Sequence, residues 1–250
     1  MIELFSYSLS TFELIIILIS AIFIGMGKTG VPGAGMISIP LIVIVFSSKA
    51  STGIILPLLI FGDLFAVYNY SKFTNWKHLK RLLPLTLIGV VIASVIGTQI
   101  NDLMFRNIMG ITIFFIIGLM VWQERKPVTK TPDSLWFITL MGIACGFTTM
   151  IGNLAGPLIG LYLLSMRFPK KEFIGTGAWY FLIVNLFKIP FHIFAWETIT
   201  LNSFLLDIAL LPGIALGAWI GVKVMKCIKE KTFRYLVIGI TFLAAIAIFI

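Results

Sequence analysis

Few ionisable side chains interrupt the apolar stretches of this sequence, and those few are its first candidates for chemistry. Asp63, Lys188 and His192 lie inside long apolar segments, and Lys28 lies in a glycine-rich stretch. An ionisable group at the centre of a membrane span costs about 2.5–3.5 kcal/mol on insertion scales, so such residues usually have a function. These four side chains are typical of a charge pair, a proton-exchanging group or a binding site for an anion.

Two interpretations of these residues remain open. A match of Thr52-Gly53 with Thr176-Gly177 aligns two apolar segments. In that alignment Asp63 falls within one residue of Lys188, which predicts a charge pair between two halves of the chain. In the functional interpretation, Asp63 or His192 takes part in proton coupling and Lys188 attracts an anion. In the structural interpretation, the ion pair only stabilises the fold and His192 is a hydrogen-bonded packing residue.

Two glycine-rich stretches are suited to hold an anion through the backbone. Residues 25–40 read GMGKTGVPGAGMISIP and residues 142–157 read GIACGFTTMIGNLAGP. Glycine lets a helix break, and the freed N-terminus of the next helix offers N–H donors and about half a positive charge to an anion. Two such breaks facing each other would form an oxyanion cradle. The predicted cradle residues are Gly27, Lys28, Thr29, Gly30, Gly33, Gly35, Thr148, Thr149, Gly152, Asn153 and Gly156.

The composition requires these stretches to lie in a membrane. Of the 250 residues, 59% are hydrophobic and only 12% charged, whereas a soluble domain is about 45–50% apolar and about 25% charged. A soluble, disordered or disulfide-framed protein is therefore excluded. Long apolar runs without alternation also exclude an outer-membrane barrel. The net charge of +9 is better explained by basic cytoplasmic loops than by nucleic-acid binding.

Helix length determines which segments cross the bilayer, because a span needs about 20 apolar residues. Two pairs of shorter segments, about 15 residues each, are predicted to be hairpins or broken helices that meet inside the membrane. The predicted spans are 52–71, 80–100, 104–122, 173–194, 201–221 and 234–250, and the short pairs are 12–26 with 33–47 and 135–150 with 152–166.

Basic residues predict the orientation. Most Lys and Arg lie in segments 71–81, 123–134, 166–172 and 222–234, which the positive-inside rule assigns to the cytoplasm. Residues 135–166 must then enter and return on the cytoplasmic side, and residues 12–47 on the outer side. Both termini are predicted to lie outside a cytoplasmic membrane.

The two halves also repeat each other. Gly25, Gly35 and Pro40 match Gly142, Gly152 and Pro157 at an offset of 117, and Pro84 matches Pro212 at an offset of 128. Because the halves begin on opposite sides, the predicted fold is an all-α polytopic membrane protein of two inverted-topology repeats, each a short broken-helix pair plus three spanning helices. The repeats comprise residues 1–122 and 135–250, joined by a cytoplasmic linker at 123–134. Secondary transporters built this way bind substrate between the repeats near the midplane.

The paired segments GMGKTGVPGAGMISIPLIV and GFTTMIGNLAGPLIGLYLLS, each near the start of one half, resemble the TauE/SafE family of sulfite and organosulfonate transporters. The resemblance covers nearly the whole chain. It implies transport of a small sulfur oxyanion or organosulfonate across the cytoplasmic membrane, driven by an ion gradient. Protons are the coupling ion in the hypothesis on Asp63 and His192 above. The first motif departs from the small apolar residues of such loops at Lys28 and Pro32, and the second carries Asn153 in place of a glycine.

Other functions stay open at this point. A channel or transporter for a cation or neutral solute would fit the architecture, although the spans offer few carboxylates to line a cation route. An intramembrane enzyme is disfavoured, because the sequence has two histidines and no HExxH or GxSxG motif, yet a mechanism using Asp63 is conceivable. Neither a cofactor, a metal nor nucleic acid is predicted as a partner. The expected partners are the anion, a coupling ion and the lipid bilayer, and a homodimer stays open.

Overall fold

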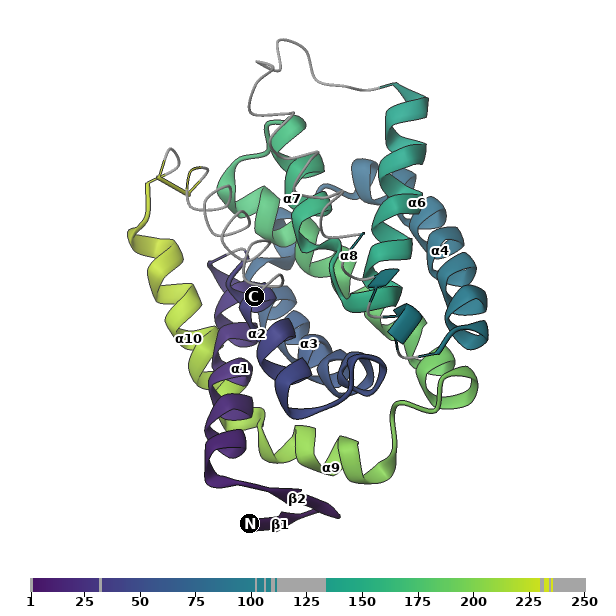
Figure 1. Cartoon of the computed structure of the whole chain (residues 1–250). Coiled ribbons are helices and arrows are strands. Elements are labelled where there is room, and N and C mark those ends of the chain that lie inside the picture. Colours follow the sequence, from purple (N-terminus) through teal and green to yellow (C-terminus); the bar gives the residue numbers. More distant parts are fainter. Residues whose placement is uncertain are drawn as a thin grey trace.

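The computed structural model describes residues 2–31, 33–101, 103–105, 107–108, 111, 134–229, 232–233 and 235, and this part of the chain is mainly helical (Figure 1). The chain contains a short 3₁₀ turn, Ser71–Phe73, and a π-helix, Phe191–Ala195. The other elements are β1 (Ile2–Leu4), β2 (Tyr7–Leu9), α1 (Thr11–Thr29), α2 (Ala34–Val45), α3 (Ser48–Tyr70), α4 (Trp76–Gln99), α6 (Leu135–Gly152), α7 (Ala155–Ser165), α8 (Lys170–Pro190), α9 (Leu201–Ala209) and α10 (Leu211–Cys227).

Several helices are long and apolar enough to cross a membrane, which confirms a multi-pass helical membrane protein. Within the described residues these are α1, α3, α4, α6 and α8, and the bent pair of α9 and α10 passes the same test when taken together. The predicted spans 52–71, 80–100 and 173–194 correspond to α3, α4 and α8. All of the predicted span 234–250 except Tyr235, most of 104–122 and nearly all of the linker 123–134 lie outside the described residues.

The predicted pairs of equally short helices are wrong in one respect. The first member of each pair is long enough to span alone: α1 has 19 residues and α6 has 18. Only α2 and α7, with 12 and 11 residues, are short. The sequence places the ends of these first members at residues 26 and 150, whereas α1 continues to Thr29 and α6 to Gly152. Glycines such as Gly25 and Gly146 lie inside these helices, where they let another helix approach closely.

The predicted span 201–221 is not one continuous helix but two helices bent by 48°, which pass the test for a span only when taken together. The first, α9, ends where the Leu210 N–H bonds to the carbonyls of Leu206 and Asp207. Pro212 then stands in the first turn of α10. Proline has no N–H to donate, so it is tolerated at a helix start and not inside a continuous helix.

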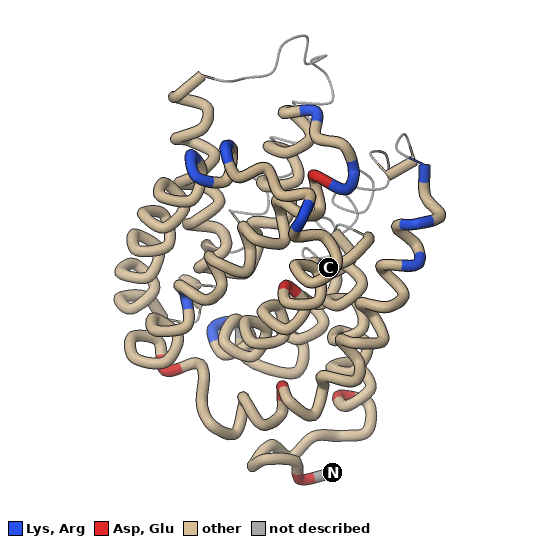
Figure 2. Tube along the Cα trace, turned by 180° about the vertical axis from the view of Figure 1, so that it is seen from behind, with Lys and Arg blue, Asp and Glu red and all other residues tan. Residues whose placement is uncertain are grey.

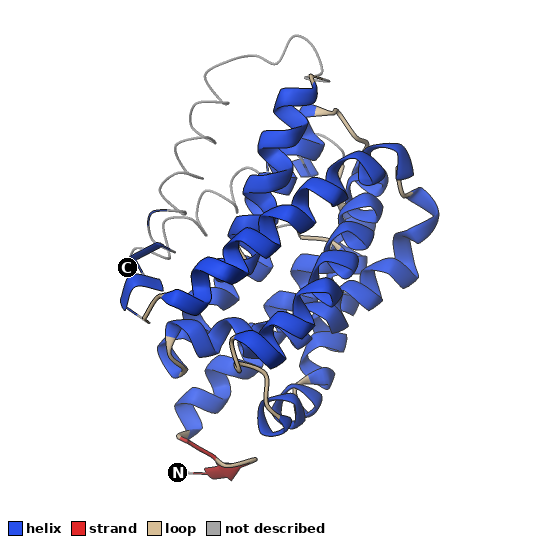
Figure 3. Ribbon diagram, turned by 90° about the vertical axis from the view of Figure 1, so that its right-hand side faces the viewer, coloured by secondary structure: helices blue, strands red, loops and turns tan. Residues whose placement is uncertain are grey.

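An N-terminal hairpin was not predicted at all. Strands β1 and β2 pair antiparallel, with Ile2 opposite Leu9, and Figure 3 shows the hairpin at one end of the helical bundle. The two turn residues, Phe5 and Ser6, both have positive φ, as the tight turn of a two-residue hairpin requires. Strands of three residues are too short to produce a recognisable alternation in the sequence.

The charges divide the molecule into two ends. The α3–α4 and α7–α8 connections and the carboxyl end of α10 lie at one end, and the N-terminal hairpin and α9 lie at the other (Figure 1). Figure 2 shows that most Lys and Arg gather at the end opposite the N-terminus. We call this the basic end, and its described members are Lys72, Lys77, Lys80, Arg81, Arg167, Lys170, Lys171, Lys223, Lys226 and Lys229.

Helix pairs frame the centre of the bundle. Helix α1 packs along α10, α6 packs along α4, and α3 packs against α8 between them. The short helices α2 and α7 turn back against α1 and α6. This arrangement brings both helix breaks, one between α1 and α2 and one between α6 and α7, next to the central helices α3 and α8.

Candidate functional site

Each helix break turns on one residue in the left-handed backbone region. At the first break Gly33 has φ 95° and precedes α2. At the second break Asn153 has φ 57° and separates α6 from α7. Glycine adopts this conformation freely and asparagine more readily than other residues. Asn153 therefore does what a glycine would do at this turn, and it adds a polar side chain.

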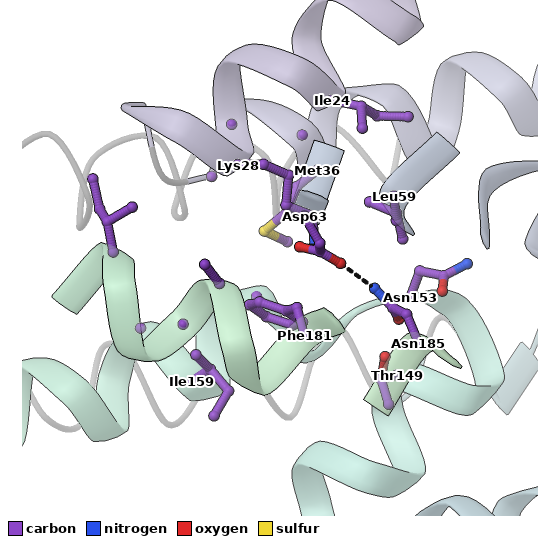
Figure 4. Close-up of a pocket in the computed structure, with 18 of the residues that line it drawn as sticks. Ile24, Lys28, Met36, Leu59, Asp63, Thr149, Asn153, Ile159, Phe181 and Asn185 are labelled. Atoms are coloured by element: carbon purple, nitrogen blue, oxygen red, sulfur yellow. Dashed lines mark hydrogen bonds and ion pairs between the residues drawn. The ribbon is translucent and has the colours of Figure 1, made fainter. Parts of the chain in front are cut away.

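A cavity of about 110 Å³ lies between the two breaks and the central helices (Figure 4). Its wall is mostly apolar, with polar groups contributed by both breaks and by α3 and α8. The lining residues are Ile24, Gly27, Lys28, Gly33, Gly35, Met36, Ile39, Ile55, Leu59, Asp63, Thr149, Asn153, Gly156, Ile159, Gly160, Leu163, Phe173, Ile174, Gly177, Ala178, Phe181 and Asn185.

Lys28 is the cation of this cavity. Its Nζ lies 2.7 Å from Asp63 Oδ1 and 4.1 Å from the centre of the Phe181 ring, a cation–π contact. The other carboxylate oxygen of Asp63 accepts a hydrogen bond from Asn185 Nδ2 at 2.7 Å. Gly62 leaves room for the lysine stem, because a Cβ there would lie only 3.0 Å from Lys28 Cγ. Lys28 thus stands at the cavity wall, with 13% of its side chain accessible.

Lys188 lies behind the wall of the cavity. Its ammonium is buried and donates to the Thr149 carbonyl oxygen at 2.8 Å and to Asn153 Oδ1 at 2.6 Å. The Thr149 carbonyl belongs to the last turn of α6 and also accepts from the Asn153 N–H. A cation at the carboxyl end of a helix is favoured by the helix dipole. Lys188 therefore stabilises the second break.

Charge and backbone donors together suit an anion. With Lys28, Lys188 and Asp63 ionised, the centre carries one positive charge in excess. Gly35 and Gly156 are each the second residue of a helix, α2 and α7, and both line the cavity. The first N–H groups of a helix have no acceptor within it and attract anions. Two helix starts and one lysine therefore face the same small space.

Eight of the predicted residues line the cavity and the rest do not. Those at the wall are Gly27, Lys28, Gly33, Gly35, Asp63, Thr149, Asn153 and Gly156. Those away from it are Thr29, Gly30, Thr148, Gly152, Lys188 and His192.

The residues away from the wall have other contacts. Thr29 Oγ1 donates to the Ala218 carbonyl, and a Cβ on Gly30 would clash with the backbone of Gly221 on α10. Thr148 Oγ1 donates to the Cys145 carbonyl within α6. The His192 ring bonds through Nδ1 to Thr198 Oγ1. These side chains were grouped by sequence proximity, but a helix directs neighbouring residues to different faces.

The predicted direct pair of Asp63 with Lys188 is wrong. Asp63 pairs with Lys28, and Asn185 stands between Asp63 and Lys188. The glycine match used for the alignment placed the counterpart of Asp63 about one helical turn too far along α8. In the structure the residue facing Asp63 is Asn185, 122 positions later.

Sequence analysis missed Asn185 and Phe181. Asn185 could have been found from the sequence, because it is a polar residue within the apolar span 173–194 and lies one turn before Lys188. Phe181 carried no signal, since an aromatic residue in a membrane helix is ordinary. Its contact with Lys28 depends on how α1 and α8 meet.

Comparison with known proteins identifies the family. The family model described as Sulfite exporter TauE/SafE matches residues 16–248. No curated protein and no solved structure matches the chain. The match includes both helix breaks and every residue that lines the cavity. This is a family of membrane transporters and not of enzymes, and the chain belongs to it, the TauE/SafE family of sulfite exporters.

Proposed function

We propose that this protein is a secondary active transporter that moves a sulfur oxyanion or organosulfonate across the cytoplasmic membrane, with the central cavity as its binding site. One observation carries the proposal: Lys28 and the starts of α2 and α7 line the same cavity. In a low-dielectric interior, fixed N–H dipoles and a cation bind a small anion far more strongly than they would in water. Of the two groups hypothesised to couple an ion gradient, Asp63 lines this cavity and His192 does not.

We further propose that the two halves are inverted repeats. Matching contacts in the two halves support this. A Cβ on Gly25 would clash with the Ile214 carbonyl, and a Cβ on Gly146 would clash with the Thr86 carbonyl. These are the same contact if α1 corresponds to α6 and α10 to α4, in a correspondence that pairs Gly25 with Gly146 in place of the Gly142 of the sequence match.

A second set of contacts repeats in the same correspondence. Gly217 on α10 has no room for a Cβ beside the Ile22 carbonyl of α1, and Gly89 on α4 has none beside the Ile143 carbonyl of α6. The match of α4 with α10 agrees with the Pro84 and Pro212 offset found in the sequence. Packing of equivalent glycines on equivalent carbonyls is what a twofold pseudosymmetric bundle requires.

The mechanism we propose is alternating access, and the cavity's shape supports a state open toward the basic end. The lining includes Phe173 and Ile174 near the start of α8, which follows the basic α7–α8 connection. Ser51 and Thr52, the fourth and fifth residues of α3 as Phe173 and Ile174 are of α8, do not line the cavity. Exchanging the conformations of the two halves would open the cavity at Thr52 and close it at Ile174. By the positive-inside rule the basic end is cytoplasmic.

Cysteine labelling tests this exchange. In a background without Cys145 and Cys227, Ile174→Cys should react with a membrane-impermeant thiol reagent only from the basic end. Thr52→Cys should be protected at rest and should become reactive from the opposite end when sulfite is added. Failure of Thr52→Cys to react from that end under any condition would contradict alternating access by exchange of the halves.

Uptake by proteoliposomes tests the substrate class. Sulfite, thiosulfate, taurine and a divalent cation are offered in parallel under an imposed ion gradient. We expect accumulation of sulfite or of another sulfur anion and none of the cation, because Asp63, the one carboxylate among the described residues that line the cavity, is already paired. Accumulation of the cation alone would overturn the anion assignment.

A further inference from the structure

The ammonium of Lys188 has an unusual set of partners. Lys188 is fully buried, yet every acceptor the structure gives it is neutral. These acceptors are the Thr149 carbonyl oxygen at 2.8 Å, Thr149 Oγ1 at 3.3 Å, Asn153 Oδ1 at 2.6 Å and Asn185 Oδ1 at 3.5 Å. A buried charge normally has an opposite charge beside it, because desolvation costs several kcal/mol. Lys188 therefore has the capacity to receive a carboxylate.

The acceptors of Lys188 belong to the binding site although Lys188 does not. Thr149, Asn153 and Asn185 all line the cavity, and Lys188 holds them from behind. Asn153 also donates through Nδ2 to the Thr52 carbonyl on α3. Lys188 thus connects the second helix break to the central helices and orients the polar groups that face the cavity.

Asn185 connects Lys188 to Asp63, which is the only carboxylate at the cavity wall in the part of the chain that the structure describes. Its Nδ2 donates to Asp63 Oδ2, and its Oδ1 accepts from Lys188. Asp63 is in turn paired with Lys28. A continuous polar chain therefore runs from Lys28 on α1, through Asp63 on α3 and Asn185 on α8, to Lys188.

An anion bound at Lys28 would disturb this chain. Lys28 cannot fully serve both the anion and Asp63, so Asp63 would be left as a buried negative charge beside a second one. Breaking a buried ion pair by removing one partner costs about 3–5 kcal/mol. The charged or titratable groups that face Asp63 are Lys28 on α1 and Lys188 on α8. Lys188 is the only fully buried lysine in the part of the chain that the structure describes.

We propose that Lys188 is a positioning residue that exchanges ion-pair partners with Lys28: when the anion takes Lys28, the Asp63 carboxylate turns from Lys28 to Lys188, displacing Asn185. No bond is made or broken and no proton moves, so the charge of the chain itself is unchanged. Lys188 also bonds to Thr149 and Asn153 at the second helix break. The exchange therefore links binding of the anion at the first break to the hydrogen bonds of the second. This inference rests on the proposed anion site.

The groups around Lys188 fit this role. The next titratable side chain after Lys188 is His192, in the π-helix that follows α8, and it is bonded to Thr198. Helices α6 and α7 contribute only neutral acceptors, Thr149 and Asn153. The charges that act on Lys188 are those of Lys28 and Asp63. The main alternative to this exchange is protonation of Asp63 when the anion binds Lys28. A neutral Asp63 would not need Lys188 as a second cation.

A double-mutant cycle on sulfite uptake separates these cases. Lys188→Gln is measured in the wild-type background and in the Asp63→Asn background, with KM and maximal rate determined for each protein. With Asp63 present, Lys188→Gln should raise KM by about tenfold, equal to ~1.4 kcal/mol. In the Asp63→Asn background Lys188 has no carboxylate to receive, so Lys188→Gln should raise KM by a factor at least about fivefold smaller. Such a coupling between the two substitutions is well above the usual additivity error. Lys188→Arg should recover most of the wild-type KM.

Equal losses in the two backgrounds would overturn the inference, because a purely structural Lys188 or a protonated Asp63 predicts additivity. Wild-type KM in the Lys188→Gln variant would overturn it as well. Melting temperatures of the purified variants show whether each protein is folded. If Lys188→Gln does not fold, Lys188→Met replaces it in the same cycle, since it keeps the length of the buried side chain and removes only its charge. If the wild-type protein transports sulfite and the two substitutions have additive effects on KM, this inference alone is refuted. If the wild-type protein transports no sulfur anion, the proposed function is refuted too.

Discussion

Replacing Lys28 by glutamine is expected to weaken sulfite uptake by about 10- to 100-fold, the largest effect of any single change at the cavity. Hydrogen bonds to charged groups contribute about 1.5–3 kcal/mol, and Lys28 is the only cation that lines the cavity among the described residues. The loss should appear as a raised KM. The measurement is initial uptake over a range of sulfite concentrations.

The controls must separate binding from folding. Removing Lys28 leaves Asp63 buried without a cation, which by itself costs about 3–5 kcal/mol of stability. The double variant Lys28→Gln with Asp63→Asn removes that charge and should restore the melting temperature without restoring uptake. Lys226→Gln, at an exposed lysine of α10, controls for loss of positive charge. Normal uptake by the double variant would show that Lys28 does not bind the substrate.

The second large effect is expected on stability, at the glycines where helices touch. Gly25→Ala and Gly146→Ala should each lower the melting temperature of the detergent-solubilised protein by roughly 5–10 °C. The reason is overpacking, at about 1–3 kcal/mol per site. A Cβ at either position would collide with a carbonyl of the neighbouring helix, Ile214 for Gly25 and Thr86 for Gly146. Because a backbone atom cannot rotate away, the whole helix must shift.

A matched glycine provides the control for this measurement. A Cβ on Gly177 would have the Leu163 side chain as its nearest neighbour, at an ordinary 3.8 Å, and Gly177 lies within α8. Gly177→Ala should therefore leave the melting temperature unchanged or raise it, since alanine favours a helix by about 1 kcal/mol over glycine. If the two contacts are equivalent in two repeats, Gly25→Ala and Gly146→Ala should lower the melting temperature by similar amounts. A loss at only one of them would contradict that equivalence.

Some features of the fold were predictable because a membrane restricts the possible structures. An apolar chain in lipid must satisfy its backbone within helices, so composition and length alone predicted α3, α4 and α8 closely. Irregular backbone at that depth is tolerated only in a protein interior or beside a cavity. For the same reason the stretches around Gly33 and Asn153 could be recognised as breaks near a site.

Glycine was the least informative residue in the sequence. Gly33 lies at a helix break, just before α2, whereas Gly25 and Gly146 lie within helices. The difference is made by neighbours distant in the chain, since a glycine beside a crossing helix is retained for space and not for flexibility. Sequence periodicity contains no information on which helix will cross at that point.

The residue types alone therefore established that this is a helical membrane protein with two interrupted segments and four candidate ionisable groups within its apolar or glycine-rich stretches, because desolvation makes such groups rare and conspicuous. Which of these groups meet was decided only by the tertiary structure. Asp63 bonds to Lys28 and Asn185, not to Lys188, because one turn of difference in the register of α3 against α8 selects another partner. A side chain within a helix has a predictable depth in the bilayer, but its partner depends on the rotation and crossing of whole helices.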